Sequence, residues 1–129
     1  MAGYSDTPLL KKLGIKDDSH VAVIGFPLRG PEELSVYSET LQPDLNVIVF
    51  FTKSSEELEN AFPNLIASTV QNGSIWISWP KKSSGVFTDL VENHVRDIGL
   101  AAGVVDVKVC AVDEVWSGLK FVRRIKDRL

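Results

Sequence analysis

Several basic and aromatic side chains of this 129-residue chain stand directly after apolar segments, where they could bind an anion. Lysine and arginine attract phosphate and carboxylate groups. A tryptophan ring offers a flat face on which a planar ligand can stack. Neighbouring carboxylates add groups that can accept protons or pair with the lysines. The candidate ligand-binding residues are Arg29, Lys53, Trp79, Lys81, Lys82, Asp113, Glu114 and Trp116.

The lysines and carboxylates of this set also have a purely structural interpretation. Lys81 and Lys82 could form exposed ion pairs with Asp113 and Glu114, worth about 0–1 kcal/mol each, and so hold one loop against another. The two carboxylates are the best placed for acid–base chemistry, although sequence neighbours on an extended segment point in opposite directions. The sequence leaves both interpretations open.

Nucleophilic catalysis and metal binding have little support in the sequence. Cys110 lies within a strand pattern, which predicts a buried and unreactive thiol. His94 stands beside apolar helix positions, which favours a packed imidazole, and His20 precedes the first strand, at the edge opposite the candidates. One cysteine and two histidines show no zinc-ligand spacing. We therefore predict no metal site and assign no catalytic residue.

The small residues near Trp79 are typical of turns. Ser83-Ser84-Gly85 could offer hydroxyl and N–H groups to a phosphate, but it lacks the G-x-x-x-x-G-K-[ST] pattern. Gly85 and Gly118 are predicted to serve turn geometry. Trp76 stands inside a continuous apolar run, which predicts a core position.

The elements that must position these residues begin with three almost continuously apolar runs. They are Val21–Ile24, Leu45–Phe51 and residues 75–77, and they are rich in β-branched and aromatic side chains. Such runs are typical of strands covered on both faces. Helix signals separate them, and strands that alternate with helices pair in parallel. Because ligands bind beyond the carboxyl ends of parallel strands, we expect the candidates to share one rim.

Capping patterns predict two helices between these strands. Pro31, followed by two glutamates, marks the first turn of one helix. Ser54 and Glu57 have the spacing of a capping box and open a second helix. Pro63 lies inside the second pattern, so we expect a kink or two short helices there.

Two further helices are expected outside that region. One opens near Thr88 and ends at Gly99 or Gly103. The other is a short leader helix within residues 7–15 that stops at Gly14.

The C-terminal part of the chain predicts a hairpin. Residues 105–111 alternate between apolar and polar side chains, and residues 119–125 follow without room for a helix between them. The closing strand must run antiparallel to its predecessor. Basic residues near the end suit an exposed tail or sheet edge, namely Arg123, Arg124, Lys126 and Arg128.

Together these elements predict one three-layer α/β domain over residues 1–129, in which residues 1–19 form a leader segment. Its sheet has about five strands and is mostly parallel, with an antiparallel C-terminal strand. The chain is long enough for a single core, since a domain of this size buries roughly two-thirds of the surface of its unfolded chain.

Composition excludes several classes of protein. No apolar run approaches the roughly 20 residues of a membrane helix, and the N-terminal segment has no hydrophobic signal core. The net charge of −3 and the absence of a long basic run argue against nucleic acid as a partner. With one cysteine and no disulfide possible within the chain, we expect a soluble, cytoplasmic protein. Its partners would be an anionic small molecule or another protein, and the exposed end of the sheet could pair with a second copy in a homo-oligomer.

The order of elements resembles the class I S-adenosylmethionine-dependent methyltransferase core in a shortened, Rossmann-like form. The leader helix, a first strand that ends in Gly25 and the final hairpin carry this resemblance. A second resemblance, which covers nearly the whole chain, rests on the runs LGI (13–15), WPKKSSG (79–85), VDVKVCAVD (105–113) and WSGLK (116–120). In these runs the chain resembles a bacterial family of short proteins of unknown function, DUF3052, which brings no established reaction.

The chain departs from the methyltransferase pattern at the cofactor-binding positions. Members of that family have a glycine-rich turn after the first strand and an acidic residue at the end of the second strand that holds the ribose hydroxyls. Here Phe26, Pro27 and Leu28 make the turn bulky, and Pro27 has no N–H to donate. The interval 31–44 holds room for one helix, so the strand with the ribose-binding carboxylate is expected to be absent. Only Gly25 is left as a cofactor-binding candidate.

From these observations the sequence favours a non-catalytic binding module that uses the basic and aromatic rim and needs no cofactor. The alternative is an enzyme whose shortened core binds S-adenosylmethionine or another nucleotide-like cofactor. A deep pocket at the Gly25 turn would favour the enzyme, and a shallow basic rim would favour the module.

Overall fold

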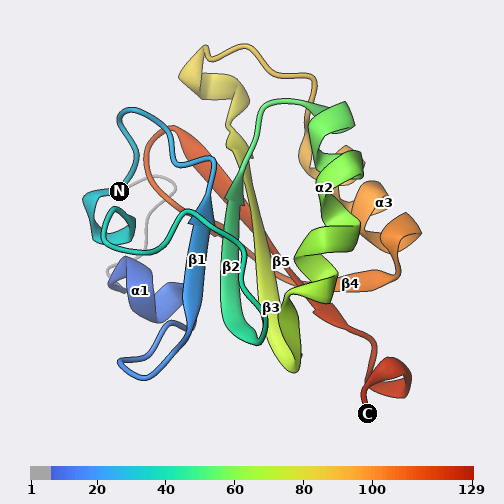
Figure 1. Ribbon diagram of the computed structural model, residues 1–129. Helices are drawn as coiled ribbons and strands as arrows, with labels where there is room; N and C mark the ends of the chain where they lie inside the picture. The colour runs from blue at the N-terminus through green and yellow to red at the C-terminus, as the bar shows by residue number, and fades with distance from the viewer. Residues whose placement is uncertain (1–6) are drawn as a thin grey trace.

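The computed structural model describes residues 7–129, which form a sheet with helices on both faces (Figure 1). The strands are β1 (Val21–Ile24), β2 (Leu45–Phe51), β3 (Thr69–Pro80), β4 (Val104–Ala111) and β5 (Trp116–Arg123). The α-helices are α1 (Leu9–Lys12), α2 (Ser55–Ala67) and α3 (Glu92–Ala102). Single 3₁₀ turns occur at η1 (Glu32–Leu34), η2 (Lys82–Ser84) and η3 (Ile125–Asp127).

The five described strands lie in the order β1-β2-β3-β5-β4. Strands β1, β2 and β3 are parallel, and β5 runs antiparallel between β3 and β4. The predicted mixed α/β fold with an antiparallel C-terminal strand is confirmed. Because β5 returns directly from β4 through a short connection, it can pair only antiparallel to it.

The apolar side chains form one core on each face of the sheet. Helices α2 and α3 cover one core, whose largest buried side chains include Phe62 and Phe121 in edge-to-face contact. On the other face, α1 and η1 cover a core around Trp76, which is fully buried as the sequence predicts. The indole N–H of Trp76 donates a hydrogen bond to the carbonyl oxygen of Leu13 at 3.0 Å. This bond ties the leader segment to the middle of the sheet.

The leader helix is shorter than residues 7–15, because it comprises only Leu9–Lys12. Gly14, at φ 74°, turns the chain toward the sheet, as expected of a stop residue. The part of the predicted leader segment within residues 1–6 lies outside the described residues. No helix within residues 7–129 has the length and apolarity needed to cross a membrane.

The prediction that Ser54 caps α2 is confirmed, but the predicted capping box is only half formed, because Thr52 lies between the Ser54 N–H and the Glu57 carboxylate. The hydroxyl of Ser54 accepts a hydrogen bond from the backbone N–H of Glu57 at 3.2 Å. The carboxylate of Glu57 accepts from the hydroxyl of Thr52, which also accepts from the backbone N–H of Ser54. Pro63 lies within α2 without dividing it, so the expectation of two short helices is wrong. Leu58, Phe62 and Leu65 are buried on both sides of Pro63, and this packing holds the helix together.

The helix predicted at Pro31 is a single 3₁₀ turn, η1. Only Leu34 of this segment is buried, whereas Val36 is 80% exposed. One apolar anchor buries too little surface to offset the entropy of ordering a longer helix.

Helix α3 begins at Glu92, later than the predicted start near Thr88. The hydroxyl of Thr88 donates to the carbonyl oxygen of Lys53 at 2.7 Å, and the carboxylate of Asp89 binds Ser55. These contacts hold the segment before α3 against the start of α2. The helix ends at Gly103, whose φ of 104° matches the predicted glycine stop.

Arg123 is not part of an exposed tail. Its guanidinium donates to the carbonyl oxygens of Val70 at 2.7 Å and Thr69 at 3.1 Å, and also to that of Ile66. It therefore joins β5 to the end of α2 and the start of β3. The segment after it is exposed from Ile125 onward, as predicted for the tail.

Candidate functional site

The predicted binding residues do lie at one edge of the sheet, at the top of Figure 1. The backbone N–H of Thr52 donates to the carbonyl oxygen of Ser78 at 3.0 Å, so β2 and β3 end side by side. Pro80 pairs with Trp116, and the N–H of Lys81 donates to the carbonyl oxygen of Val115 at 2.8 Å. Strand direction therefore brings the segments around Trp79 and Trp116 to the same edge, which we call the carboxyl edge.

The two tryptophans cannot serve as stacking surfaces as predicted. Trp79 is 4% exposed and packs in the core under α2 and α3. Trp116 is 6% exposed and packs in the core on the other face, where its ring meets Phe51 edge to face at 5.1 Å. Neighbouring positions on paired strands alternate faces, which explains why the two rings turn away from each other.

A cleft of about 230 Å³ opens beside the end of β3. Trp79, Lys81 and Lys82 line it, together with Glu92 at the start of α3. Arg29 and Lys53 are exposed on the turns that follow β1 and β2 and do not line this cleft. The basic residues of the rim therefore all follow the ends of strands, but only Lys81 and Lys82 line the same cleft.

Asp113 has a structural role in the hairpin tip. One carboxylate oxygen accepts hydrogen bonds from the backbone N–H groups of Val115 and Trp116, both at 2.8 Å. Glu114 is exposed. Within residues 7–129, Arg96 forms ion pairs with Glu92 and Asp106, and Lys82 forms none with Asp113 or Glu114.

The turn after β1 is closed by its own side chains. Gly25 has φ 72°, and a Cβ at this position would lie 2.5 Å from the carbonyl oxygen of Phe51. The ring of Phe26 packs edge to face on Phe51 at 5.9 Å and lies against Gly30. The N–H of Gly30 donates to the carbonyl oxygen of Pro27 at 3.0 Å. Gly25 is thus needed for the close packing of β1 on β2.

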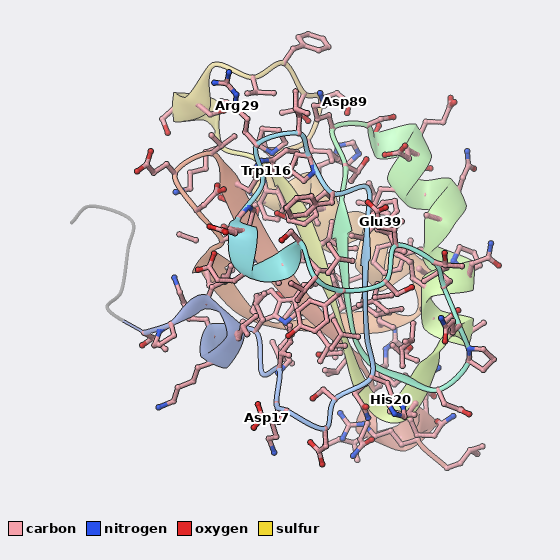
Figure 2. All side chains as sticks on the ribbon, turned by 60° about the vertical axis from the view of Figure 1, so that its left-hand side comes forward. Asp17, His20, Arg29, Glu39, Asp89 and Trp116 are labelled. Carbon is pink, nitrogen blue, oxygen red and sulfur yellow. The ribbon has the colours of Figure 1, made fainter. Side chains whose placement is uncertain are left out.

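The structure adds Glu39 to the candidate functional residues, although the sequence analysis did not single it out. Between β1 and β2 the described chain has no full strand, but Ser38 forms an isolated parallel bridge with Ala22. The N–H of Val23 donates to the carbonyl oxygen of Ser38 at 2.8 Å. Glu39 follows this bridge, is exposed, and lies in the half of the molecule that also holds Arg29 (Figure 2). One residue of pairing leaves no hydrophobic pattern, so the sequence could not reveal it.

The remaining predictions about reactive groups agree only in part with the geometry, because the sequence predicts a buried Cys110 and the structure does not bury it fully. Cys110 is half-buried, and its burial raises the pKa of the thiol, partly opposed by the nearby Lys12 and Lys108 charges. His94 is half-buried beside a groove between α2 and α3. His20 is exposed at the end opposite Arg29 (Figure 2).

Of the two glycines predicted to serve turns, only Gly85 does so, with φ 76°. Gly118 lies within β5, where a Cβ would come within 3.2 Å of the Trp76 ring. Gly118 is therefore a packing position. Among the described residues no group of three or more His, Cys, Asp or Glu side chains is arranged to hold a metal ion.

Solved structures similar to this chain include S-adenosylmethionine-dependent methyltransferases. A methyltransferase of this kind from Aquifex aeolicus matches with a TM-score of 0.59 and 18% identity, over 88% of this chain and 86% of that one. The ribosomal protein L11 methylase from Lactobacillus delbrueckii subsp. bulgaricus matches with a TM-score of 0.58 and 12% identity, over 90% of this chain and 75% of that one. This is the methyltransferase-type Rossmann-like α/β fold.

Other matches are to longer proteins. The magnesium protoporphyrin IX methyltransferase from Synechocystis PCC 6803 with bound SAM matches with a TM-score of 0.52 and 13% identity. The match covers 68% of this chain but only 45% of that one, so the chain spans less than half of that protein. No family model and no curated protein matches the chain, and the resemblance to DUF3052 is therefore without support.

These comparisons correct the functional prediction. The non-catalytic module without a cofactor was the preferred interpretation. This finding contradicts it, because the two structures described above that match over most of the chain are a methylase and a methyltransferase. Structures of the magnesium protoporphyrin IX enzyme hold bound SAM or SAH. The matches favour the enzyme alternative.

Proposed function

We propose that this chain is a shortened S-adenosylmethionine (SAM)-dependent methyltransferase that binds SAM at the carboxyl edge, between the ends of β1 and β2. The observation that carries the proposal is the match to the Aquifex aeolicus methyltransferase, which covers 88% of this chain and 86% of that one. That match supports a methyltransferase core of nearly this extent. In such α/β sheets ligands bind beyond the carboxyl ends of the strands.

The charged residues at this edge fit SAM. Glu39 follows the bridge beside β1, which is where the acidic residue that holds the ribose hydroxyls stands in the methyltransferase pattern. Arg29 and Lys53 are exposed cations at the ends of β1 and β2, suited to the carboxylate of the cofactor. Bound SAM would supply an electrophilic methyl group.

The turn 25–30 fits less well than a glycine-rich turn would. Pro27 has no N–H, and the N–H of Gly30 already donates to Pro27. Fewer backbone donors are left to hold the cofactor, so the side chains of Glu39 and Arg29 would carry more of its binding.

The acceptor of the methyl group would enter the cleft beside β3. This cleft lies two strands from β1, which corresponds to about 10 Å at the usual strand spacing. Lys81 and Lys82 line it and would orient an anionic acceptor molecule. In this arrangement the donor and acceptor lie side by side along one edge.

Calorimetric titration with SAM and with S-adenosylhomocysteine (SAH) tests the proposal. We expect saturable binding in the micromolar range. Glu39→Gln should weaken it about tenfold or more, because a hydrogen bond to a charged group contributes about 1.5–3 kcal/mol. The matched control is Glu33→Gln, which changes an exposed glutamate of η1 and should leave affinity unchanged.

The two lysines of the cleft provide a second control. Lys81→Gln combined with Lys82→Gln should bind SAH like the parent protein, since both residues belong to the acceptor side. Absence of binding at about 1 mM of either compound would overturn the proposal, as would equal affinity of the Glu39→Gln and parent proteins.

A further inference from the structure

A second cleft, of about 370 Å³, lies at the opposite end of the sheet. It opens on the face covered by α1, where the loop 14–19 forms one wall. Figure 2 shows Asp17 of this loop at the end of the molecule away from Arg29 and Asp89. From Ser74, which lines the cleft, β3 runs six residues to Pro80, which corresponds to about 20 Å. A ligand in this cleft would therefore not touch the carboxyl edge.

Two of the three charged residues that line this cleft are basic. Lys16 and Lys120 both line it, against the single carboxylate of Asp18. Lys120 is half-buried and stands directly opposite Lys108 in the β4–β5 pairing. Within residues 7–129, neither Lys16 nor Lys120 forms an ion pair. Like charges opposite each other on paired strands are unfavourable, and a bound anion would offset that cost.

Neutral hydrogen-bond donors line the same cleft. The side-chain oxygen of Asn46 accepts from the backbone N–H of His20 at 2.7 Å, which leaves the NH₂ group of this amide to donate. Asn72 and the hydroxyl of Ser74 add further polar groups, and Ser74 is only 7% exposed. An oxygen-rich anion in the cleft would find these groups as hydrogen-bond donors.

The shape of the cleft is built by an irregularity in β3. Leu45 pairs with Thr69, but Val47 pairs with Ser74, so residues 70–73 have no partners in β2. At Gly73 a Cβ would lie 3.1 Å from each of three backbone carbonyl oxygens, which leaves little room for any other residue. Such a bulge is a specific feature of the backbone rather than a fraying end.

We propose that this cleft binds a small phosphorylated molecule through Lys16, Lys120 and the amide of Asn46. Lysine is a common phosphate ligand. The volume is at the lower end of the range for small-molecule sites, which suits a metabolite of sugar-phosphate size. The site goes beyond the proposed methyltransferase function, because it lies at the other end of the sheet and shares no residue with the carboxyl edge.

Amide chemical shifts of the ¹⁵N-labelled full chain test this site. Inorganic phosphate and ribose 5-phosphate are titrated at constant ionic strength, with ribose and sodium chloride as neutral and ionic controls. We expect saturable shifts of Ser19, Gly73 and Ser74 with both phosphates and none with ribose. Lys16→Gln combined with Lys120→Gln should weaken the affinity about tenfold or more. The matched control combines Lys11→Gln with Lys126→Gln, two exposed lysines outside the cleft.

The outcomes separate this site from the one at the carboxyl edge. The proposal would be overturned if the Lys16→Gln/Lys120→Gln and Lys11→Gln/Lys126→Gln variants bound phosphate with equal affinity. It would also be overturned if phosphate shifted the amide signals near all exposed lysines to the same extent. Thermal unfolding of each variant checks that it is folded. Binding of SAH, measured on the same variants, should be unchanged, so a failure at one end of the sheet is distinguishable from a failure at the other.

Discussion

Gly25 combines two constraints that act on a single residue. Its φ of 72° lies in the left-handed region, and the space for a Cβ is taken by the carbonyl oxygen of Phe51 at 2.5 Å. Gly85 has nearly the same φ, 76°, but no atom lies within 4 Å of its Cβ position. A comparison of Gly25 with Gly85 therefore separates the cost of the left-handed conformation from the cost of close packing.

We predict that Gly85→Ala lowers the free energy of unfolding by about 1–2 kcal/mol, the cost of the left-handed conformation. Gly25→Ala should cost a further 1–3 kcal/mol or so, because β1 must move away from β2. Urea denaturation followed by tryptophan fluorescence measures both. Equal costs would show that β1 and β2 are not packed as tightly as described. A change at Gly25 is therefore a poor probe of ligand binding, since it disturbs the fold itself.

At the scale of the elements, the start of α2 is held by a segment that comes later in the chain. The carboxylate of Asp89 accepts from the hydroxyl of Ser55 at 2.7 Å and from its backbone N–H at 2.9 Å. The hydroxyl hydrogen bond, followed by the backbone one, lowers the pKa of Asp89 below its usual value of 3.8. The charged carboxylate thus links α2 to the segment that leads into α3.

This link should depend on pH. A carboxyl whose pKa is lowered in the folded protein stabilises the fold above its unfolded pKa, and this contribution is lost as the pH falls through the folded value. We expect Asp89→Ala to lower Tm at pH 6 and to have progressively less effect below about pH 4. Differential scanning calorimetry across this range measures the difference from the parent protein. Asp127→Ala, at an exposed position of η3, is the control. A Tm difference that persists unchanged at about pH 2 would contradict the assignment.

At the scale of the whole molecule, the two proposed sites lie at opposite ends of one sheet. The strands between them are almost fully buried, with Trp76 and Ile77 at 0% exposure in the middle of β3. A ligand that binds only the folded state raises its stability, and ligands at independent sites contribute separately.

We predict that SAH and ribose 5-phosphate each raise Tm and that their free-energy contributions add when both are present. Thermal unfolding with neither, one and both ligands at saturation gives the comparison. If the second ligand added nothing to the first, both would occupy one site, and a sum that exceeds additivity would indicate coupling between the two ends.

The strands were the part of the fold most open to prediction. Val21–Ile24 and Leu45–Phe51 were predicted with their observed bounds, because strands buried on both faces are apolar throughout. In β3 only residues 75–77 were recognised, although the strand spans Thr69–Pro80. Its outer parts carry polar side chains such as Asn72 and Ser78, which conceal the pattern.

The candidate site was predictable as a place but not as a set of contacts. Strand direction alone brought Lys81, Lys82 and the hairpin tip to one edge. The alternation of faces that buries Trp79 and Trp116 depends on register, which an apolar run does not fix. The position of Glu39 depends on a single bridge, and the second cleft, lined by Lys16 and Lys120, depends on a bulge in β3. Neither feature has a periodic pattern in the sequence.

The amino-acid sequence by itself determined the fold class and the parallel strands, and it determined that the chain closes with an antiparallel hairpin. Hydrophobic patterning and capping depend on residues close together in the chain, so they can be read from it directly. Only the tertiary structure decided which side chains meet: the burial of both tryptophans, Asp113 turned into its own hairpin, and Lys120 placed opposite Lys108. These contacts join residues from different strands, and the packing of the whole sheet sets them.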